Sequence, residues 1–223
     1  MRALLQKIRI VRAFIKLIQD PKKTDMVFKI SDSGRARNNP ALEDTIRHIN
    51  SCEGFQENFN ANYNPTLPAL EELAGYPEGT LGREFARHMQ ANGLAIDFYP
   101  TERRDGVVAY IVNRSRKMHD LWHVITGFGI SVEDEVGLQA FTLMQLRSPL
   151  SGILVASGLL HSALLNPAVF HRMLSRITTG FEMGKACKAL IGVRLEDKLH
   201  VPVQQLRKEF GIQVGVEMLS KVP

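Results

Sequence analysis

The chain has 223 residues, of which 44% are hydrophobic and 23% charged, and its formal net charge is +5. This balance is typical of a globular protein with one substantial core, and it excludes a disordered chain, a collagen-like repeat and a disulfide-rich scaffold. The two cysteines, Cys52 and Cys187, are far apart and form no Cys-x-x-Cys pair, which indicates a reducing, intracellular setting with two thiols; the alternative is a single disulfide bridge between them.

The positive charge is concentrated at the N-terminal end. Residues 1–40 hold ten Lys and Arg against three Asp, a net charge of +7, whereas the remainder holds 18 basic against 20 acidic residues, a net charge of −2. A basic end of this kind suits nucleic acid, an anionic membrane or an import signal. Aromatic side chains do not alternate with the cations in a stacking pattern, so we expect no nucleic-acid partner.

Residues 1–18 are predicted to form a basic amphipathic helix. Their apolar side chains recur at steps of four and three, as the residues of one helical stripe do: Leu4, Ile8, Val11, Ile15 and Ile18. The segment lacks the apolar core of a secretory signal and the serines of a mitochondrial presequence. Two interpretations stay open, a first core helix with a solvated basic face and a helix that docks on an anionic bilayer through Arg9, Arg12 and Lys16.

Helical periodicity dominates the chain beyond this segment, and we find neither alternating strand hairpins nor an internal repeat. The predicted fold class is all-α. The expected organisation is the basic helix (residues 1–20), an irregular connection (21–40) and one helical domain (41–223). Within that domain the predicted helices cover residues 40–49, 67–73, 80–89, 107–127 and 131–146. Two or three further helices are expected after residue 146, one of them within 148–170, and a short one covers 202–210.

Residues 148–170 carry no formal charge and are long enough to span a membrane. Only 13 of these 23 residues are apolar, and two prolines, a histidine and an asparagine interrupt them, so a buried helix is the better interpretation. Its small residues, among them Ala156 and Gly158, permit tight helix packing or leave space for another apolar molecule.

The most informative motif is His119-Asp120-Leu-Trp-His123, which is followed by a carboxylate at Glu135. On a helix, His119 and His123 lie one turn apart on one face, and Asp120 falls on the same side. Ser131 predicts the N-cap of the next helix, which would place Glu135 in its first turns and return it to the same place. Two imidazoles and two carboxylates suit zinc, manganese or iron, and with added water they suit magnesium.

The motif is open to other interpretations. Histidine pairs at this spacing also occur as solvated or core-edge residues. A zinc protease requires Glu after the first histidine, where this chain has the shorter Asp120, so peptide hydrolysis is disfavoured. A His-Asp phosphohydrolase requires a further upstream histidine and a distant aspartate; His88 and Asp197 are candidates, but the sequence does not link them to the motif.

In the motif, eleven residues separate His123 from Glu135. Three further segments of the chain accompany the motif. They are Tyr76-Pro-Glu-Gly-Thr-Leu-Gly-Arg-Glu-Phe85, Ala109-Tyr-Ile-Val-Asn-Arg114 and Leu206-Arg-Lys-Glu-Phe-Gly-Ile212. The motif follows the second of these segments and precedes the third. With this order of segments, the sequence of residues 67–212 resembles that of the family of coenzyme Q biosynthesis protein 4.

The resemblance implies a single-domain helical bundle with an apolar channel between helices for a polyprenyl tail. It implies one divalent metal ion, zinc first and magnesium as the alternative, held by the residues that match His119, Asp120, His123 and Glu135. For the lipid and its head group we predict contacts from Arg114, Arg116, Ala156 and Gly158. The two arginines would bind a phosphate or carboxylate through paired hydrogen bonds, the alternative being solvation or pairing with Glu84 or Glu133.

The expected function is therefore in ubiquinone synthesis, with a prenylated quinone precursor or polyprenyl lipid bound so that its head group lies beside the metal. The enzymatic form is a metal-dependent decarboxylase or hydroxylase that performs oxidative decarboxylation at ring carbon C1. The alternatives are a non-catalytic lipid-presenting scaffold of a quinone-synthesis complex and a metal-dependent hydrolase. Expected partners are the membrane surface and other quinone-synthesis proteins, with a homodimer as one assembly. The expected location is a peripheral one inside the cell, on the cytoplasmic face of a bacterial membrane or the matrix side of the mitochondrial inner membrane.

Overall fold

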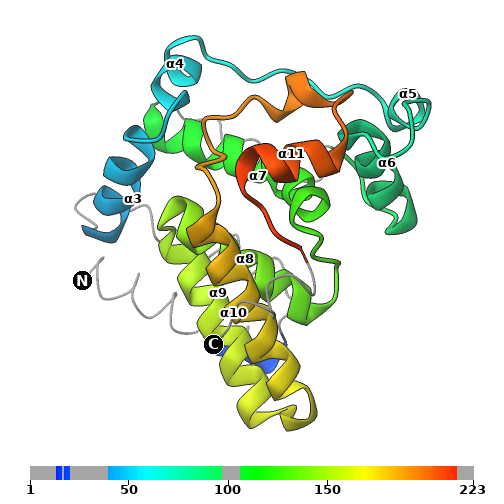
Figure 1. Ribbon diagram of the computed structural model, residues 1–223. Helices are drawn as coiled ribbons and strands as arrows, with labels where there is room; N and C mark the ends of the chain where they lie inside the picture. Colours follow the sequence, from blue (N-terminus) through cyan, green and yellow to red (C-terminus); the bar gives the residue numbers. More distant parts are fainter. Residues whose placement is uncertain (1–13, 17, 21–39, 97–105, 215–223) are drawn as a thin grey trace. The chain divides into compact units, whose positions relative to one another are not determined.

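The computed structural model describes residues 14–16, 18–20, 40–96 and 106–214. Within these residues the chain is helical and forms no sheet, with one isolated β-bridge between Thr80 and Pro202, so the all-α prediction is confirmed. The elements are α3 (Pro40–Asn50), α4 (Phe55–Asn60), α5 (Leu70–Leu73), α6 (Leu81–Ala91), α7 (Val107–Thr126), α8 (Val132–Leu146), α9 (Pro149–Leu164), the 3-10 turn η1 (Pro167–Val169), α10 (Phe170–Ala186), the 3-10 turn η2 (Leu195–Lys198) and α11 (Val203–Phe210) (Figure 1).

The chain divides into two compact units. Unit 1 comprises residues Met1–His48 and Gly129–Lys185, and unit 2 comprises Ile49–Phe128 and Ala186–Pro223. The single helical domain predicted for residues 41–223 stays a prediction, since both units take residues from it. Of the connection predicted for residues 21–40, only Pro40 is among the described residues. Arg9 and Arg12 of the N-terminal segment also lie outside the described residues.

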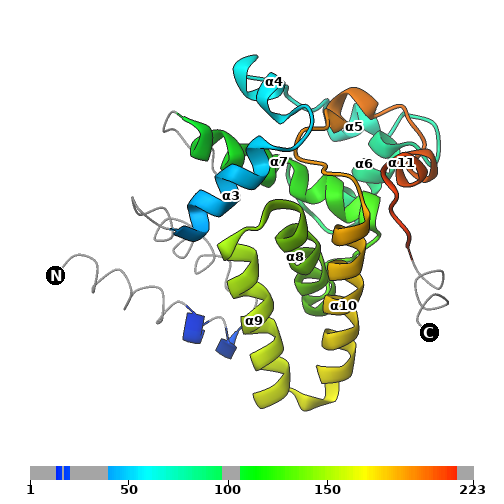
Figure 2. The same cartoon turned by 60° about the vertical axis from the view of Figure 1, so that its left-hand side comes forward.

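In unit 1, α8, α9 and α10 lie side by side, and small residues set their spacing (Figures 1 and 2). A Cβ atom on Gly180 of α10 would lie 1.9 Å from the carbonyl oxygen of Gly137 on α8. A Cβ atom on Gly158 of α9 would lie 2.5 Å from Cγ2 of Val136, also on α8. Both distances are far below van der Waals contact, so the helices can approach this closely only where side chains are absent.

Helix α3 supplies partners for the end of α8. The last carbonyl groups of a helix have no partner within it. The Thr45 hydroxyl donates to the carbonyl oxygen of Arg147 at 2.8 Å, and Nε2 of His48 lies 3.1 Å from the carbonyl oxygen of Gln145. These contacts connect two segments of unit 1 that are about a hundred residues apart in the chain.

In unit 2, α7 packs against α6 and α11 and buries Met118, Leu121 and Trp122 on its inner side. Gly127 follows α7 with a φ of 79°, a left-handed conformation that glycine adopts without strain, and its N–H donates to the carbonyl oxygen of His123. The end predicted for this helix is therefore correct to one residue, and the histidine motif occupies its last two turns.

Residues 148–170 form α9 and η1 and enter α10. Among the described residues no single helix has the length and hydropathy of a membrane span. Taken together, the stretches 149–164 and 167–186 satisfy those criteria by length and composition alone, with a bend of 117° between them.

Candidate metal site

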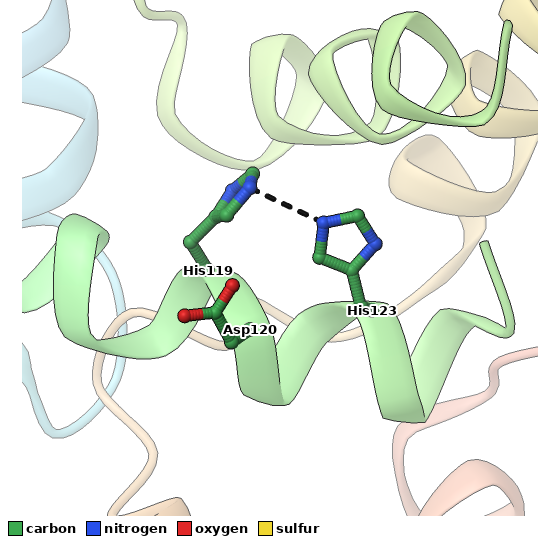
Figure 3. Close-up of side chains that lie close together, drawn as sticks. All are labelled: His119, Asp120 and His123. Atoms are coloured by element: carbon green, nitrogen blue, oxygen red, sulfur yellow. Dashed lines mark hydrogen bonds between the residues drawn. The ribbon is translucent and has the colours of Figure 1, made fainter. Parts of the chain in front are cut away.

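The structure brings three of the four predicted ligands together on α7. One potential ligand atom from each of His119, Asp120 and His123 lies within 4.8 Å of the other two. Both imidazoles project from the same side of the helix, with Asp120 beside them, and the two Nε2 atoms are 3.2 Å apart (Figure 3). A helix achieves this because residues four apart fall on the same face.

His123 is held in one orientation by the backbone that follows the helix. Its ring is buried, with 2% of its surface exposed, and Nδ1 lies 3.0 Å from the carbonyl oxygen of Phe128. Because a carbonyl oxygen can only accept, Nδ1 is the donor in this hydrogen bond, and in the neutral imidazole Nε2 then carries the lone pair. That lone pair is directed toward His119. Metal-binding histidines in proteins have this arrangement, in which one ring nitrogen donates to the protein and the other faces the metal.

Arg207 of α11 stabilises the end of α7 that carries His123. Its Nε donates to the carbonyl oxygen of Ile125 at 2.8 Å, and its Nη2 donates to that of Val124 at 3.0 Å. Burial lowers the pKa of the Arg207 guanidinium, and the carboxylate of Glu84 opposes this shift. The arginine thereby provides partners for carbonyl groups that the helix itself leaves unsatisfied.

A third imidazole lies against the site. The ring of His88, from α6, stacks on the ring of His123 with 5.1 Å between centroids and 23° between planes. The phosphohydrolase alternative nominated His88 together with Asp197. Asp197 accepts a hydrogen bond from the Tyr63 hydroxyl at 2.8 Å. The sequence contained no signal for the ring stacking, because α6 and α7 meet only in the fold.

The fourth predicted ligand, Glu135, lies in the first turn of α8 in unit 1, where its N–H donates to the carbonyl oxygen of Ser131. Its role as a ligand stays a prediction. The predicted N-cap is confirmed, since the Ser131 hydroxyl accepts from the N–H of Asp134 and donates to the Asp134 carboxylate. That carboxylate also lies 2.8 Å from Arg176, so Asp134 contacts both the N-cap serine of α8 and an arginine of α10 within unit 1.

Arg114, which is predicted to contact the head group, is buried. Its guanidinium forms a buried ion pair with the carboxylate of Glu196, which is neither of the two partners named in the alternative. The same guanidinium lies 5.3 Å from the ring centroid of Tyr63. The ion pair holds Arg114 within unit 2, and its contact with a head group stays a prediction.

Gly158 corrects the channel prediction at its own position, because its contact with Val136 leaves no space for a lipid chain there. Ala156 is exposed on α9, and its predicted lipid contact stays a prediction. Arg116 is half-buried on α7, one turn before Asp120, and Lys16 is exposed; their roles also stay predictions.

The comparisons with known proteins agree on one family. The mitochondrial ubiquinone biosynthesis protein COQ4 of Laccaria bicolor is 29% identical over 204 residues, which are 90% of this chain and 67% of that protein. The mitochondrial protein coq4 of Aspergillus niger is 34% identical over 155 residues, which are 68% of this chain and 51% of that protein. The chain thus spans about two thirds of the first relative and about half of the second.

The fold has a solved counterpart. The crystal structure of a candidate ubiquinone biosynthesis protein from Nostoc punctiforme PCC 73102 matches 92% of this chain and 97% of its own, with a TM-score of 0.81 and 27% identity. The family model of the coenzyme Q (ubiquinone) biosynthesis protein Coq4 matches residues 3–215. The chain therefore belongs to the Coq4 family of ubiquinone biosynthesis proteins.

Proposed function

We propose that this protein binds the head group of a prenylated quinone precursor at a divalent metal ion in the course of ubiquinone synthesis. The observation that carries the proposal is the pair of Nε2 atoms of His119 and His123, 3.2 Å apart, with the tautomer of His123 fixed by Phe128. Membership of the family indicates the ubiquinone biosynthesis pathway. The histidine pair offers nitrogen ligands for a metal ion, to which a polar head group could bind.

The donor set suits a metal of the zinc type. His119, Asp120 and His123 offer two nitrogens and one carboxylate, and Glu135 is the proposed second carboxylate. Imidazole nitrogen favours zinc over magnesium, which prefers oxygen ligands. A bound ion of this kind would act as a Lewis acid that polarises an oxygen of the head group. The chain's own contribution is to orient His123 through Phe128 and to hold the end of α7 through Arg207.

A quinone precursor combines a polar ring with an apolar prenyl tail, and the two parts require different surfaces. For the ring we propose Arg116, which lies one helical turn from Asp120 and can donate paired hydrogen bonds to a carboxylate. For the tail we propose a contact with α9 at Ala156, which is exposed. We place this binding at the membrane surface, alongside other quinone-synthesis proteins, since the precursor itself resides in the membrane.

The experiment uses the full chain, purified in mild detergent from cells that make ubiquinone. Native mass spectrometry with lipid extraction should detect a prenylated aromatic compound together with one metal ion per chain. In the His119→Ala/His123→Ala variant both should be lost, whereas the exposed His171→Ala variant on α10 should keep both. If wild-type protein carries neither metal nor prenyl compound, and binds neither when they are supplied, the proposal is wrong.

The catalytic form of the proposal has its own test. Oxidative decarboxylation at ring carbon C1 exchanges the carboxyl group for a hydroxyl group, releases carbon dioxide and requires an oxidant such as dioxygen. The metal-loaded protein is incubated with a prenylated aromatic acid in air, and the product is identified by mass spectrometry. Turnover that depends on His119 and His123 supports the enzyme, and stable binding without turnover supports the lipid-presenting scaffold.

A further inference from the structure

Two imidazole rings contact the ring of His123, and they meet it at different angles. The ring of His119 stands at 88° to it, with 4.8 Å between ring centroids, so the edge of one ring faces the other (Figure 3). The ring of His88, from α6, is stacked on it, with 5.1 Å between centroids and 23° between planes. All three residues belong to unit 2. The difference in angle implies different roles for the two neighbouring rings.

The stacked ring of His88 is not oriented as a ligand for an ion that His123 holds. The lone pair of an imidazole nitrogen lies in the plane of its ring, so two stacked rings direct their lone pairs along separate, nearly parallel planes. Nε2 of His119, by contrast, lies 3.2 Å from Nε2 of His123. The group of potential ligand atoms within 4.8 Å of one another likewise comprises His119, Asp120 and His123. His88 therefore presents the flat face of its ring to a ligand.

A flat ring in this place opposes a movement that the hydrogen bond of His123 leaves open. Nδ1 of His123 donates to the carbonyl oxygen of Phe128, which fixes the ring at a single point. Tilting of the ring about that point would carry Nε2 away from His119. The ring of His88 closes the side on which it lies, and stacking between aromatic rings at this separation is attractive. The stacked ring thus favours the orientation in which Nε2 faces His119.

Helix α6, which carries His88, is anchored at both ends. At its start, the N–H of Leu81 donates to the carbonyl oxygen of Val201 at 2.9 Å. At its end, Nδ2 of Asn92 donates to the carbonyl oxygen of His88 itself at 2.8 Å. Between these ends α6 packs against α7, the helix that carries His123. A side chain on an anchored and packed helix keeps its position more precisely than one on a loop, so His88 can hold a neighbouring ring in place.

We propose that His88 is a positioning residue for the metal site, whose ring holds the ring of His123 in the orientation that directs Nε2 toward the metal ion. The inference rests on the proposed function, since it concerns a ligand of the proposed ion, and it adds a residue from a helix outside the motif. The property required at position 88 is a flat aromatic ring and not a nitrogen that binds the metal. Residues that orient metal ligands typically change metal affinity by about 10- to 100-fold.

The first measurement is the zinc affinity of the full chain, determined by competition with a chelator of known affinity. In His88→Ala the dissociation constant should rise about tenfold, which corresponds to about 1.4 kcal/mol. In His88→Phe, which keeps a flat ring without a nitrogen, it should stay within about threefold of wild type. The matched control is Gln90→Ala, which shortens an exposed side chain of the same helix and should equal wild type. Circular dichroism establishes that each variant is folded.

The orientation of the His123 ring is measured separately, in protein stripped of metal. Long-range proton–nitrogen NMR correlations of the imidazole rings identify the tautomer of each histidine. Wild type should show His123 in one form, with the proton on Nδ1. His88→Ala should show signals averaged between the two tautomers, because a tilting ring loses its hydrogen bond to Phe128 part of the time, and His88→Phe should restore the single form. A loss of stability alone would leave this spectrum of the folded protein unchanged.

The inference is overturned if His88→Ala binds zinc with wild-type affinity or leaves the His123 signals unchanged. It is also overturned if His88→Phe binds zinc as weakly as His88→Ala, because a nitrogen of His88 would then be the required group. These results leave the proposed function intact as long as wild type binds metal through His119 and His123. If wild type binds no metal, the proposed function is wrong, and the spectra of the metal-free protein alone decide whether His88 orients His123.

Discussion

The Nε2 atoms of His119 and His123 face each other at 3.2 Å, one turn apart on α7. Since Nδ1 of His123 donates to the carbonyl oxygen of Phe128, the tautomer of His123 is fixed before any ligand arrives. A metal ion would find a ring that needs no reorientation, and this preorganisation is what distinguishes the pair from two histidines on a solvated helix face.

The close packing of α10 on α8 predicts an unequal response of two glycines in unit 1. Gly180→Ala should lower the free energy of unfolding by at least about 2 kcal/mol, because its Cβ would meet the backbone of Gly137 at 1.9 Å. Gly152→Ala on α9 should be neutral or raise stability by about 0.5–1 kcal/mol, because the nearest atom, Cδ1 of Leu143, is 3.8 Å away. Urea unfolding followed by circular dichroism measures both, and equal effects would contradict the packing described.

The buried ion pair between Arg114 and Glu196 in unit 2 predicts that the free energy of unfolding depends strongly on both residues. Glu196→Ala should lower the free energy of unfolding by about 3–5 kcal/mol, because the buried charge of Arg114 would lose its carboxylate partner. The double variant Arg114→Met/Glu196→Leu should cost much less, since neither charge is then left buried. Thermal unfolding of the three proteins is the measurement, and a double variant as unstable as Glu196→Ala would show that the pair is not the cause.

Cys187 is predicted to be an unreactive thiol. Burial raises the pKa of its thiol from 9.0 to about 12. At pH 8 the thiolate fraction is then about a thousandfold lower than for an exposed cysteine, so alkylation should be correspondingly slow. The neutral thiol is the form that the fold favours, so this contribution to stability is present below pH 9 and is lost as the pH rises toward 12. Iodoacetamide labelling followed by peptide mass spectrometry checks the rate, and fast labelling of Cys187 in folded protein would refute the prediction.

Arg207 is predicted to hold the last turn of α7 closed. Arg207→Met should lower the free energy of unfolding by about 1–3 kcal/mol, because the carbonyl groups of Val124 and Ile125 would lose their hydrogen-bond donor. Hydrogen exchange at the amide of Gly127, which donates to the carbonyl oxygen of His123, should accelerate. The exchange rate in Arg207→Lys should lie between the rates in wild type and in Arg207→Met, since an ammonium group can donate to one of the two carbonyl oxygens but not to both in the same geometry. Unchanged exchange in Arg207→Met would contradict this role.

The helices around the motif could be predicted from the sequence because their ends carry local signals. Gly127 ends α7, Ser131 begins α8 and Gly211 ends α11, in each case within one residue of the predicted position. The helix predicted for residues 67–73 is shorter in the structure, α5 beginning at Leu70, because Pro68 disfavours a helical conformation at Leu67. Helix α4 was not predicted, since it has six residues and follows Gly54 without a side-chain cap.

The partners of the site could not be predicted, because they lie far away in the chain. Glu196 pairs with Arg114 across 82 residues, and Arg207 reaches Ile125 across the same separation. The small residues of α9 allowed two interpretations, and only the contact of Gly158 with Val136 decides for packing at that position. The sequence thus identified the cluster of His119, Asp120 and His123 on α7, whose spacing is local, and not the residues that support it.

The stoichiometry of metal binding tests the central claim most directly. The full chain is stripped of metal, dialysed against zinc and magnesium separately, and analysed by inductively coupled plasma mass spectrometry beside the variants His119→Ala/His123→Ala, Glu135→Ala and His171→Ala. The account predicts one zinc ion per chain in wild type and His171→Ala, none in the double histidine variant and weakened retention in Glu135→Ala. One tightly bound ion per chain in His119→Ala/His123→Ala, at wild-type affinity, would contradict it.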